Sequence, residues 1–191
     1  MGTGDPAALA RDKAFLGREF LTWLWYRCEV DGGEFDLRDG PVAVLFNDYV
    51  SLVSQDGESK EESIVRRASA HRSPEARTAL LSGKVVSLAK LEIARGDREW
   101  RATVVGESLD LRSVKTPPEN DETREENKEA RFVAKVEAYE ELAAILDGLY
   151  GRFLDVRLAP EWEEREAPAM GEWIRARAAA TARIAVAPST H

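Results

Sequence analysis

The chain has 191 residues with 27 basic and 35 acidic side chains, which gives a formal net charge of −8. Its single cysteine, Cys28, excludes an internal disulfide framework and cysteine-based zinc sites, and two histidines are too few for a histidine-rich metal centre. The length fits one domain, with or without helical extensions. The acidic total argues against a nucleic-acid binder, because such proteins usually carry a basic surplus.

No membrane segment or secretory signal is expected from the pattern of apolar residues. Charged side chains follow Met1 closely, and the most apolar stretch, residues 20–26, covers only about a third of a bilayer. The predicted location is therefore the cytoplasm.

Residues 14–29 are predicted to form the first helix. Apolar residues recur there at helical spacing, and Trp25 and Tyr26 add a second apolar stripe. We therefore expect a helix that is buried on more than one side and that ends at the turn Asp31-Gly32-Gly33.

The middle of the chain favours strands. Five stretches are rich in β-branched and aromatic residues or lie between turn signals: 42–54, 62–69, 84–94, 99–105 and 109–115. A short helix is predicted between the second and third of them, because Ser73 and Pro74 form a typical helix start and Gly83 a typical stop.

The last third is predicted to be helical after Pro117-Pro118. Apolar residues form one stripe along a helix of about 25–30 residues: Phe132, Val136, Tyr139, Leu142 or Ala143, Leu146, Leu149 or Tyr150, and Phe153. Prolines 160, 168 and 188 interrupt a second piece that contains Trp173. The order of elements predicts an α+β fold with a curved antiparallel sheet, a buried N-terminal helix and a long C-terminal amphipathic helix. We place the domain at residues 1–158 and a helical extension and tail at 159–191.

Charge is distributed unevenly along the chain. Residues 63–115 hold 11 basic and 6 acidic side chains, whereas residues 1–62 and 116–166 are strongly acidic. Since salt screens charges beyond about 8–10 Å, an acidic protein can still present a basic face. The total of −8 therefore does not exclude contact with nucleic acid.

Eight basic residues of this region are the candidates for phosphate contacts: Arg66, Arg67, Arg72, Lys84, Lys90, Arg101, Arg112 and Lys115. Strand alternation is expected to place Lys84 and Lys90 on one face and Arg101 opposite Trp100 and Ala102. The alternative is an ordinary solvated sheet face on which these cations pair with Glu92, Asp97 and Glu99.

The sequence contains no convincing catalytic or metal site, and no cofactor is expected. His71 lies beside Arg72 in a turn, and Cys28 lies in an apolar helix, so neither is a good candidate for a base or a nucleophile. The stretch from Asp56 to Lys60 contains the E-x-K spelling of some metal-dependent nucleases but lies in a glycine turn without a companion acid. Trp23, Trp25, Tyr26 and Trp100 are predicted to be core residues rather than stacking platforms.

An ordered series of segments resembles the RdgC-type, recombination-associated proteins of bacteria. The series comprises FLGREFLTWLWYR at 15–27, ESIVRRAS at 62–69, SPEARTALLSGKVVSLAKLEI at 73–93, LDLRSVK at 109–115 and the amphipathic helix at 133–153. The resemblance spans residues 14–158 and matches the C-terminal half of the family pattern.

This resemblance implies a non-catalytic protein that binds duplex DNA with little sequence preference, forms a homodimer and restrains RecA-driven strand exchange. It favours phosphate contacts by Arg66, Arg67, Arg72, Lys84 and Lys90, and a possible association with the nucleoid. The alternative function is a non-catalytic interaction or scaffold protein that binds a partner through the long helix at 132–153.

Overall fold

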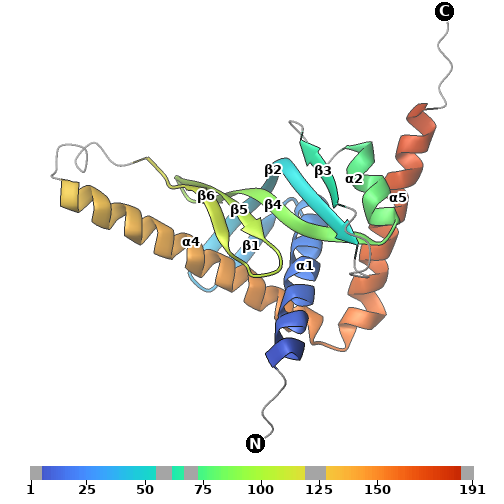
Figure 1. Ribbon diagram of the computed structural model, residues 1–191, viewed down its shortest axis with the longest axis horizontal. Helices are drawn as coiled ribbons and strands as arrows, with labels where there is room; N and C mark the ends of the chain where they lie inside the picture. The colour runs from blue at the N-terminus through green and yellow to red at the C-terminus, as the bar shows by residue number, and fades with distance from the viewer. Residues whose placement is uncertain (1–5, 55–61, 67–72, 119–127, 186–191) are drawn as a thin grey trace, which may run out of the picture.

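The computed structural model describes residues 6–54, 62–66, 73–118 and 128–185, and it contains one antiparallel sheet with helices on one of its faces (Figure 1). The helices are α1 (Pro6–Val30), α2 (Pro74–Leu81), α4 (Lys128–Arg157), the π-helix η2 (Trp162–Glu166) and α5 (Ala167–Ala185). The strands are β1 (Glu34–Leu37), β2 (Gly40–Ser54), β3 (Glu62–Arg66), β4 (Lys84–Arg95), β5 (Arg98–Val105) and β6 (Leu111–Lys115). The predicted α+β class is confirmed.

The sheet has the order β1-β2-β4-β5-β6, and β3 pairs with the second half of β2. Every pairing is antiparallel. Two irregularities interrupt the pairing of β2 with β4, one at Asn47–Tyr49 and one at Ser87. Such bulges bend strands and increase their twist, which explains the curvature of the sheet.

One face of the sheet forms the core. Along β5 the side chains alternate, so that Trp100, Ala102 and Val104 are buried while Arg101 on the opposite face is exposed. No helix in the described ranges packs on that opposite face, which we call the open face. The sheet therefore has one dry side and one side that is available to solvent.

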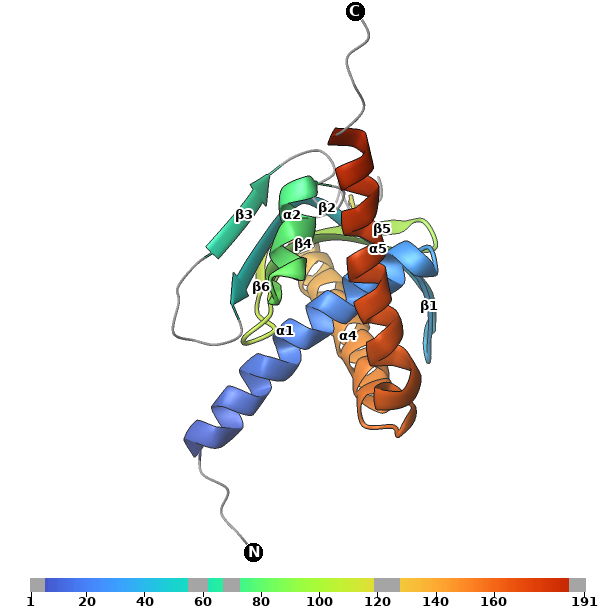
Figure 2. The ribbon, with the colours of Figure 1, turned by 90° about the vertical axis from the view of Figure 1, so that its right-hand side faces the viewer.

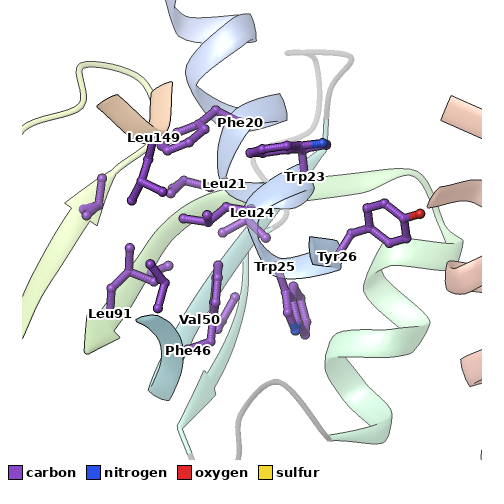
Figure 3. Packing of buried hydrophobic residues seen from close by; sticks show 14 of the residues in the cluster. Phe20, Leu21, Trp23, Leu24, Trp25, Tyr26, Phe46, Val50, Leu91 and Leu149 are labelled. Atoms are coloured by element: carbon purple, nitrogen blue, oxygen red, sulfur yellow. The ribbon is translucent and has the colours of Figure 1, made fainter. Parts of the chain in front are cut away.

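Helix α1 is the central element of the core. Every residue from Phe20 to Tyr26 is buried, because the helix packs between the sheet, α4 and α5 (Figures 2 and 3). Phe20 contacts Tyr150 and Phe153 edge-on or tilted, and Trp25 stacks on Phe46. Burial of each large apolar side chain contributes about 1.5–3 kcal/mol. The predicted burial of this helix on more than one side is confirmed.

Two small residues allow α1 to approach the sheet closely. A Cβ atom on Gly17 would lie 1.8 Å from the carbonyl oxygen of Gly106, so only glycine fits at this contact. One turn later, Thr22 Oγ1 accepts a hydrogen bond of 3.0 Å from the backbone N–H of Val86. That N–H belongs to β4 beside its bulge, and the hydroxyl supplies the partner that the interrupted strand pairing leaves out.

Helix α4 crosses the sheet with its C-terminal two-thirds. Its buried residues are Ala138, Leu142, Ile145, Leu149 and Phe153. Trp100 Nε1 donates a 2.8 Å hydrogen bond to the carbonyl of Ala138, and Arg98 and Arg95 form ion pairs with Glu141. These contacts fix the point at which α4 reaches the edge of the sheet.

The C-terminal elements join the same core. Trp162 of η2 is buried against Phe153, and Trp173 of α5 contacts Trp25 and Tyr26. The boundary predicted at residue 158 thus lies between α4 and η2, and both sides of it share one hydrophobic cluster.

Carboxylates cap the tryptophans where this cluster meets solvent. Glu166 accepts from Trp23 Nε1 at 2.8 Å, and Glu29 accepts from Trp25 at 2.8 Å and from Trp173 at 3.2 Å. A buried indole N–H needs a partner, so these acids allow large aromatic rings to enter the core without an unpaired donor.

The observed helix and strand boundaries agree with those predicted from the sequence, except at a few places. Helix α1 begins at Pro6 rather than residue 14, and strand β1 was not predicted, because four residues after a glycine turn carry little pattern. Helix α2 begins as expected, with Ser73 Oγ accepting from the N–H of Ala76 at 3.0 Å. Residues 67–69 of the second predicted strand lie outside the described residues.

A pair of leucines tests how far the core extends along α4. Leu142 is fully buried, whereas Leu158, just after the helix, is 77% exposed. Leu142→Ala should lower the free energy of unfolding by about 2–5 kcal/mol. Leu158→Ala should change it by less than about 0.5 kcal/mol. Urea unfolding measures both, and equal losses for the two variants would contradict this packing of α4.

Candidate nucleic-acid interface

The open face carries two rows of side chains that cross β4, β5 and β6. In the first row Lys90 lies opposite Thr103, which lies opposite Arg112. In the second row Glu92 lies opposite Arg101, which lies opposite Lys115. Since directly paired residues point to the same side of a sheet, strand pairing places four of the eight candidate cations on one surface. We call Lys90, Arg101, Arg112 and Lys115 the cation rows.

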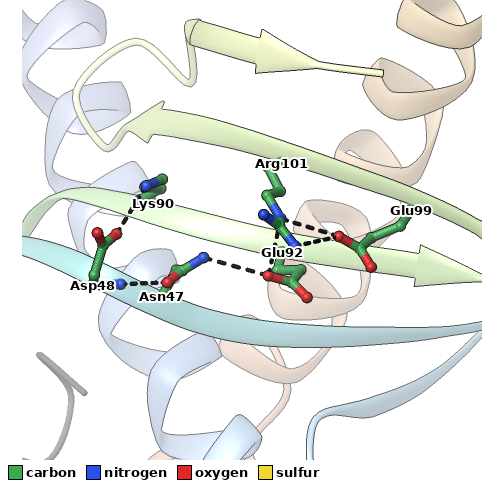
Figure 4. A network of polar contacts seen from close by, with 6 residues as sticks. All are labelled: Asn47, Asp48, Lys90, Glu92, Glu99 and Arg101. Carbon is green, nitrogen blue, oxygen red and sulfur yellow. Dashed lines mark hydrogen bonds and ion pairs between the residues drawn. The ribbon is translucent and has the colours of Figure 1, made fainter. Parts of the chain in front are cut away.

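Two members of the cation rows are paired with carboxylates (Figure 4). Lys90 Nζ lies 2.9 Å from Asp48 Oδ1. Arg101 binds Glu92 at 3.2 Å and Glu99 at 2.8 Å. This pairing was the alternative interpretation of the sequence, and it applies to these two residues.

The other two cations lie on the edge strand β6. Arg112 and Lys115 are exposed, and neither forms an ion pair with another described residue. Ser113 between them has a φ of 51°, which makes the strand irregular. Both cations are therefore free to meet an anion that approaches the edge of the open face.

The bulge in β2 explains the pairing of Lys90. The bulge places three residues of β2, Asn47 to Tyr49, opposite the single residue Lys90 of β4. Within the bulge, Asn47 Oδ1 accepts a 2.8 Å hydrogen bond from the backbone N–H of Asp48. The hydrogen bond from Lys90 holds the pKa of Asp48 below its ordinary value. The sequence analysis did not identify this bulge, although an Asn-Asp pair inside a β-branched run is a possible signal for one.

Lys84 does not share a face with Lys90, contrary to the expectation from alternation. The extra residue Ser87 reverses the side-chain order along β4, so that Lys84 lies on the same side as α2. Its Nζ donates to Ser63 Oγ at 3.0 Å. A one-residue bulge moves every residue beyond it to the other face, and alternation alone cannot reveal this.

The remaining candidates divide between the described and undescribed parts of the chain. The backbone of Arg66 lies opposite Tyr49 at the end of β3, while its side chain and all of Arg67 and Arg72 lie outside the described residues. Arg95 and Arg98, from the same basic region, bind Glu141 of α4. These two arginines therefore connect the sheet to α4 and are not part of the cation rows on the open face.

Groups suited to catalysis or metal binding are scarce in the described ranges. No cluster of three or more His, Cys, Asp or Glu side chains there could hold a metal ion. Burial raises the pKa of the Cys28 thiol, so the thiol stays protonated, and its Sγ donates to the carbonyl of Val44. His71 and the segment from Asp56 to Lys60 lie outside the described residues.

Comparisons with known proteins leave the family open, because no family model, curated protein or solved structure matches the chain. Within the described residues, no helix is long and apolar enough to cross a membrane.

The pairing of Lys90 with Asp48 can be tested by titration. Replacing Lys90 with methionine removes the hydrogen bond that favours the ionised carboxylate, so the pKa of Asp48 should rise toward its ordinary value. Because a depressed carboxyl pKa stabilises the fold above that pKa, the small stabilisation is present at neutral pH and is lost as the pH falls through it. Carbon-detected NMR of the Asp48 carboxyl measures the shift. An unchanged pKa in the variant would refute this account of the ion pair.

Proposed function

We propose that this chain binds duplex DNA without sequence preference, through phosphate contacts on the open face, and that it catalyses no reaction. The observation that supports this proposal most directly is the alignment of Lys90, Arg101, Arg112 and Lys115 in two rows on an uncovered sheet surface. Arg112 and Lys115 would make the first contacts, since no described carboxylate competes for them.

The paired cations can also contribute. Lys90 and Arg101 are partly exposed, and ion pairs in such positions contribute only about 0–1 kcal/mol to stability. A phosphate that approaches can therefore replace Asp48 or Glu92 at small cost.

The open face also carries Glu99, and strand pairing places Glu34 and Asp36 of β1 on the same side. Cations are therefore in excess only locally, around Arg112 and Lys115, and binding should be weak and sensitive to salt.

The absence of sequence preference follows from the kind of contact. Phosphate contacts position a protein on the duplex but do not distinguish bases. In the described ranges the open face presents lysine and arginine on the strands of a curved sheet, and no helix lies on that face to enter the major groove. The resemblance to RdgC-type proteins adds the expectations of a homodimer, an association with the nucleoid and restraint of RecA-driven strand exchange.

Fluorescence anisotropy with labelled duplex DNA over a series of salt concentrations tests the proposal. The logarithm of the binding constant should fall with the logarithm of salt concentration by about 0.9 per phosphate contacted. In the double variant Arg112→Glu, Lys115→Glu the slope should decrease by about 2 units, because two contacts are lost.

A matched control has the same change in net charge on the helical side of the molecule. Arg165 of η2 and Arg175 of α5 are exposed there, so Arg165→Glu, Arg175→Glu should bind more like the unmodified chain. Equal losses in the two double variants would show that only total charge matters. No binding of the unmodified chain at about 50 mM salt would refute the proposal.

A second candidate function is a protein-interaction role for the long helix. It is favoured by the exposure of four large apolar residues in the N-terminal half of α4: Phe132, Val133, Val136 and Tyr139. The β6 variants distinguish the two functions, because a complex formed through α4 should persist when Arg112 and Lys115 are reversed in charge.

A further inference from the structure

The N-terminal half of α4 carries a row of exposed apolar side chains. Phe132 is 68% exposed, Val136 40% and Tyr139 44%. Ala143 and Leu146 continue their spacing at alternating steps of four and three residues, so the five side chains lie along one side of the helix. We call these five residues the apolar track. Exposed apolar groups in a contiguous row are characteristic of an interaction surface.

The track leads into an apolar cavity of about 80 Å³, which we call the notch. Ala143 and Leu146 form its wall on α4, while Phe20 of α1 and Leu109 and Leu111 of the β5–β6 hairpin form the other walls. Since an apolar cavity that holds benzene measures roughly 150 Å³, the notch suits a branched aliphatic side chain rather than an aromatic ring. An occupant of the track can therefore anchor there through one side chain of about the size of leucine.

A line of acidic side chains runs beside the track. Glu137, Glu140 and Asp147 each follow a track residue by one position, which places them about 100° around the helix from it. Buried residues such as Ala138 and Leu142 each precede a track residue by one position. The track therefore lies between the buried side of α4 and these three carboxylates, which we call the acid line.

The acid line has no counter-ions of its own. Its three carboxylates are exposed, and none forms an ion pair with a residue that the structure describes. Glu141 is not part of the line, because it binds Arg95 and Arg98 on the sheet side. Asp147 also lines the notch, so the acid line reaches the rim of the cavity. An occupant therefore gains by placing cations along this side of the track.

The cations in the same half of α4 lie away from the acid line. Arg131 and Lys135 each precede a track residue by one position, so they are on the other side of the track, and both already have interaction partners. Lys128 lies about 13 Å along the helix axis before Glu137. None of the three is placed to neutralise the acid line.

We propose that the apolar track and the notch bind an amphipathic helix of another protein, with an aliphatic anchor in the notch and lysine or arginine along the acid line. The backbone groups of α4 are hydrogen-bonded within the helix, so a segment that docks on it must satisfy its own backbone, as a helix does. From Phe132 to Leu146 the track measures about 21 Å, which a helix of about 14 residues covers. Recognition of a helix in a groove uses apolar anchors at such steps of three and four residues.

This inference rests on the second candidate function, to which it gives a partner of defined chemistry, and it does not depend on DNA binding. The apolar track and the cation rows belong to different elements of the fold. Binding of a helix is therefore measured without DNA, so that this inference and DNA binding can each fail alone.

Fluorescence anisotropy of a labelled synthetic peptide with the full chain tests the proposal. The probe is a helix-forming peptide of about 15 residues with leucine at steps of three and four and lysine on both flanks of the leucine stripe. One control peptide carries glutamate in place of lysine, and another has the same composition in an order without the stripe. The leucine–lysine peptide should bind with a dissociation constant of about 1–500 µM, at least about tenfold more tightly than either control.

An apolar pair of variants locates the site. Val136→Asp places a charge on the track and should raise the dissociation constant of the leucine–lysine peptide at least about tenfold. Leu158→Asp introduces the same charge at an exposed apolar position outside the track and should leave the constant unchanged. Ala143→Leu extends a side chain into the notch, so it should weaken binding about fivefold or more without lowering the urea midpoint.

A charged pair of variants tests the acid line. Glu140→Lys, Asp147→Lys should weaken binding about fivefold or more at low salt, because the peptide lysines then meet like charges. Glu163→Lys, Glu164→Lys makes the same change in net charge on exposed residues of η2 and should have little effect. Equal losses in the two double variants would show that only total charge matters and would overturn the proposal.

The peptides and the chain alone supply the other contradicting results. No binding of the leucine–lysine peptide up to about 500 µM, or equal binding of the peptide without the stripe, would overturn the proposal. Equal binding of the glutamate peptide would keep an interaction role for α4 but overturn the basic partner. Sedimentation velocity of the chain without peptide should show a monomer. A dimer that Val136→Asp dissociates would make a second copy the occupant and would also overturn the proposal.

Discussion

The burial of α1 between Phe20 and Tyr26 is the constraint on which the rest of the structure depends. A helix that is apolar around its circumference must be enclosed on several sides, and here the sheet covers one side while α4 and α5 cover the others. This arrangement requires the close approach of Gly17 to Gly106 and the carboxylates that accept the indole N–H groups. All helices in the described ranges gather on one face of the sheet as a result.

No helix in the described ranges covers the open face, so its side chains are available to contact a ligand. Strand pairing aligns Lys90, Arg101, Arg112 and Lys115 there, while Asp48, Glu92 and Glu99 keep the local field moderate. A surface of this kind suits reversible contact with a polyanion better than tight recognition of one sequence.

Much of the fold could be predicted from the sequence, because its signals are local. The apolar run of α1, the Ser73 cap of α2 and the β-branched strands each depend on neighbouring residues. The candidate interface was harder to predict, since a bulge at Ser87 decides which face Lys84 occupies and a bulge at Asn47–Tyr49 brings Asp48 to Lys90. The exposure of Phe132 was also not predicted, because periodicity grouped Phe132, Val136 and Tyr139 with the core, whereas the buried stripe of α4 runs through Ala138, Leu142, Ile145, Leu149 and Phe153.

Amide chemical-shift mapping during titration with a short DNA duplex tests most directly whether the uncovered sheet face is the binding surface. The account predicts that the largest shifts fall on β5 and β6, around Arg101, Thr103, Arg112 and Lys115, and that they fade as salt is added. Shifts concentrated on α4 or α5, with β5 and β6 unaffected, would contradict it.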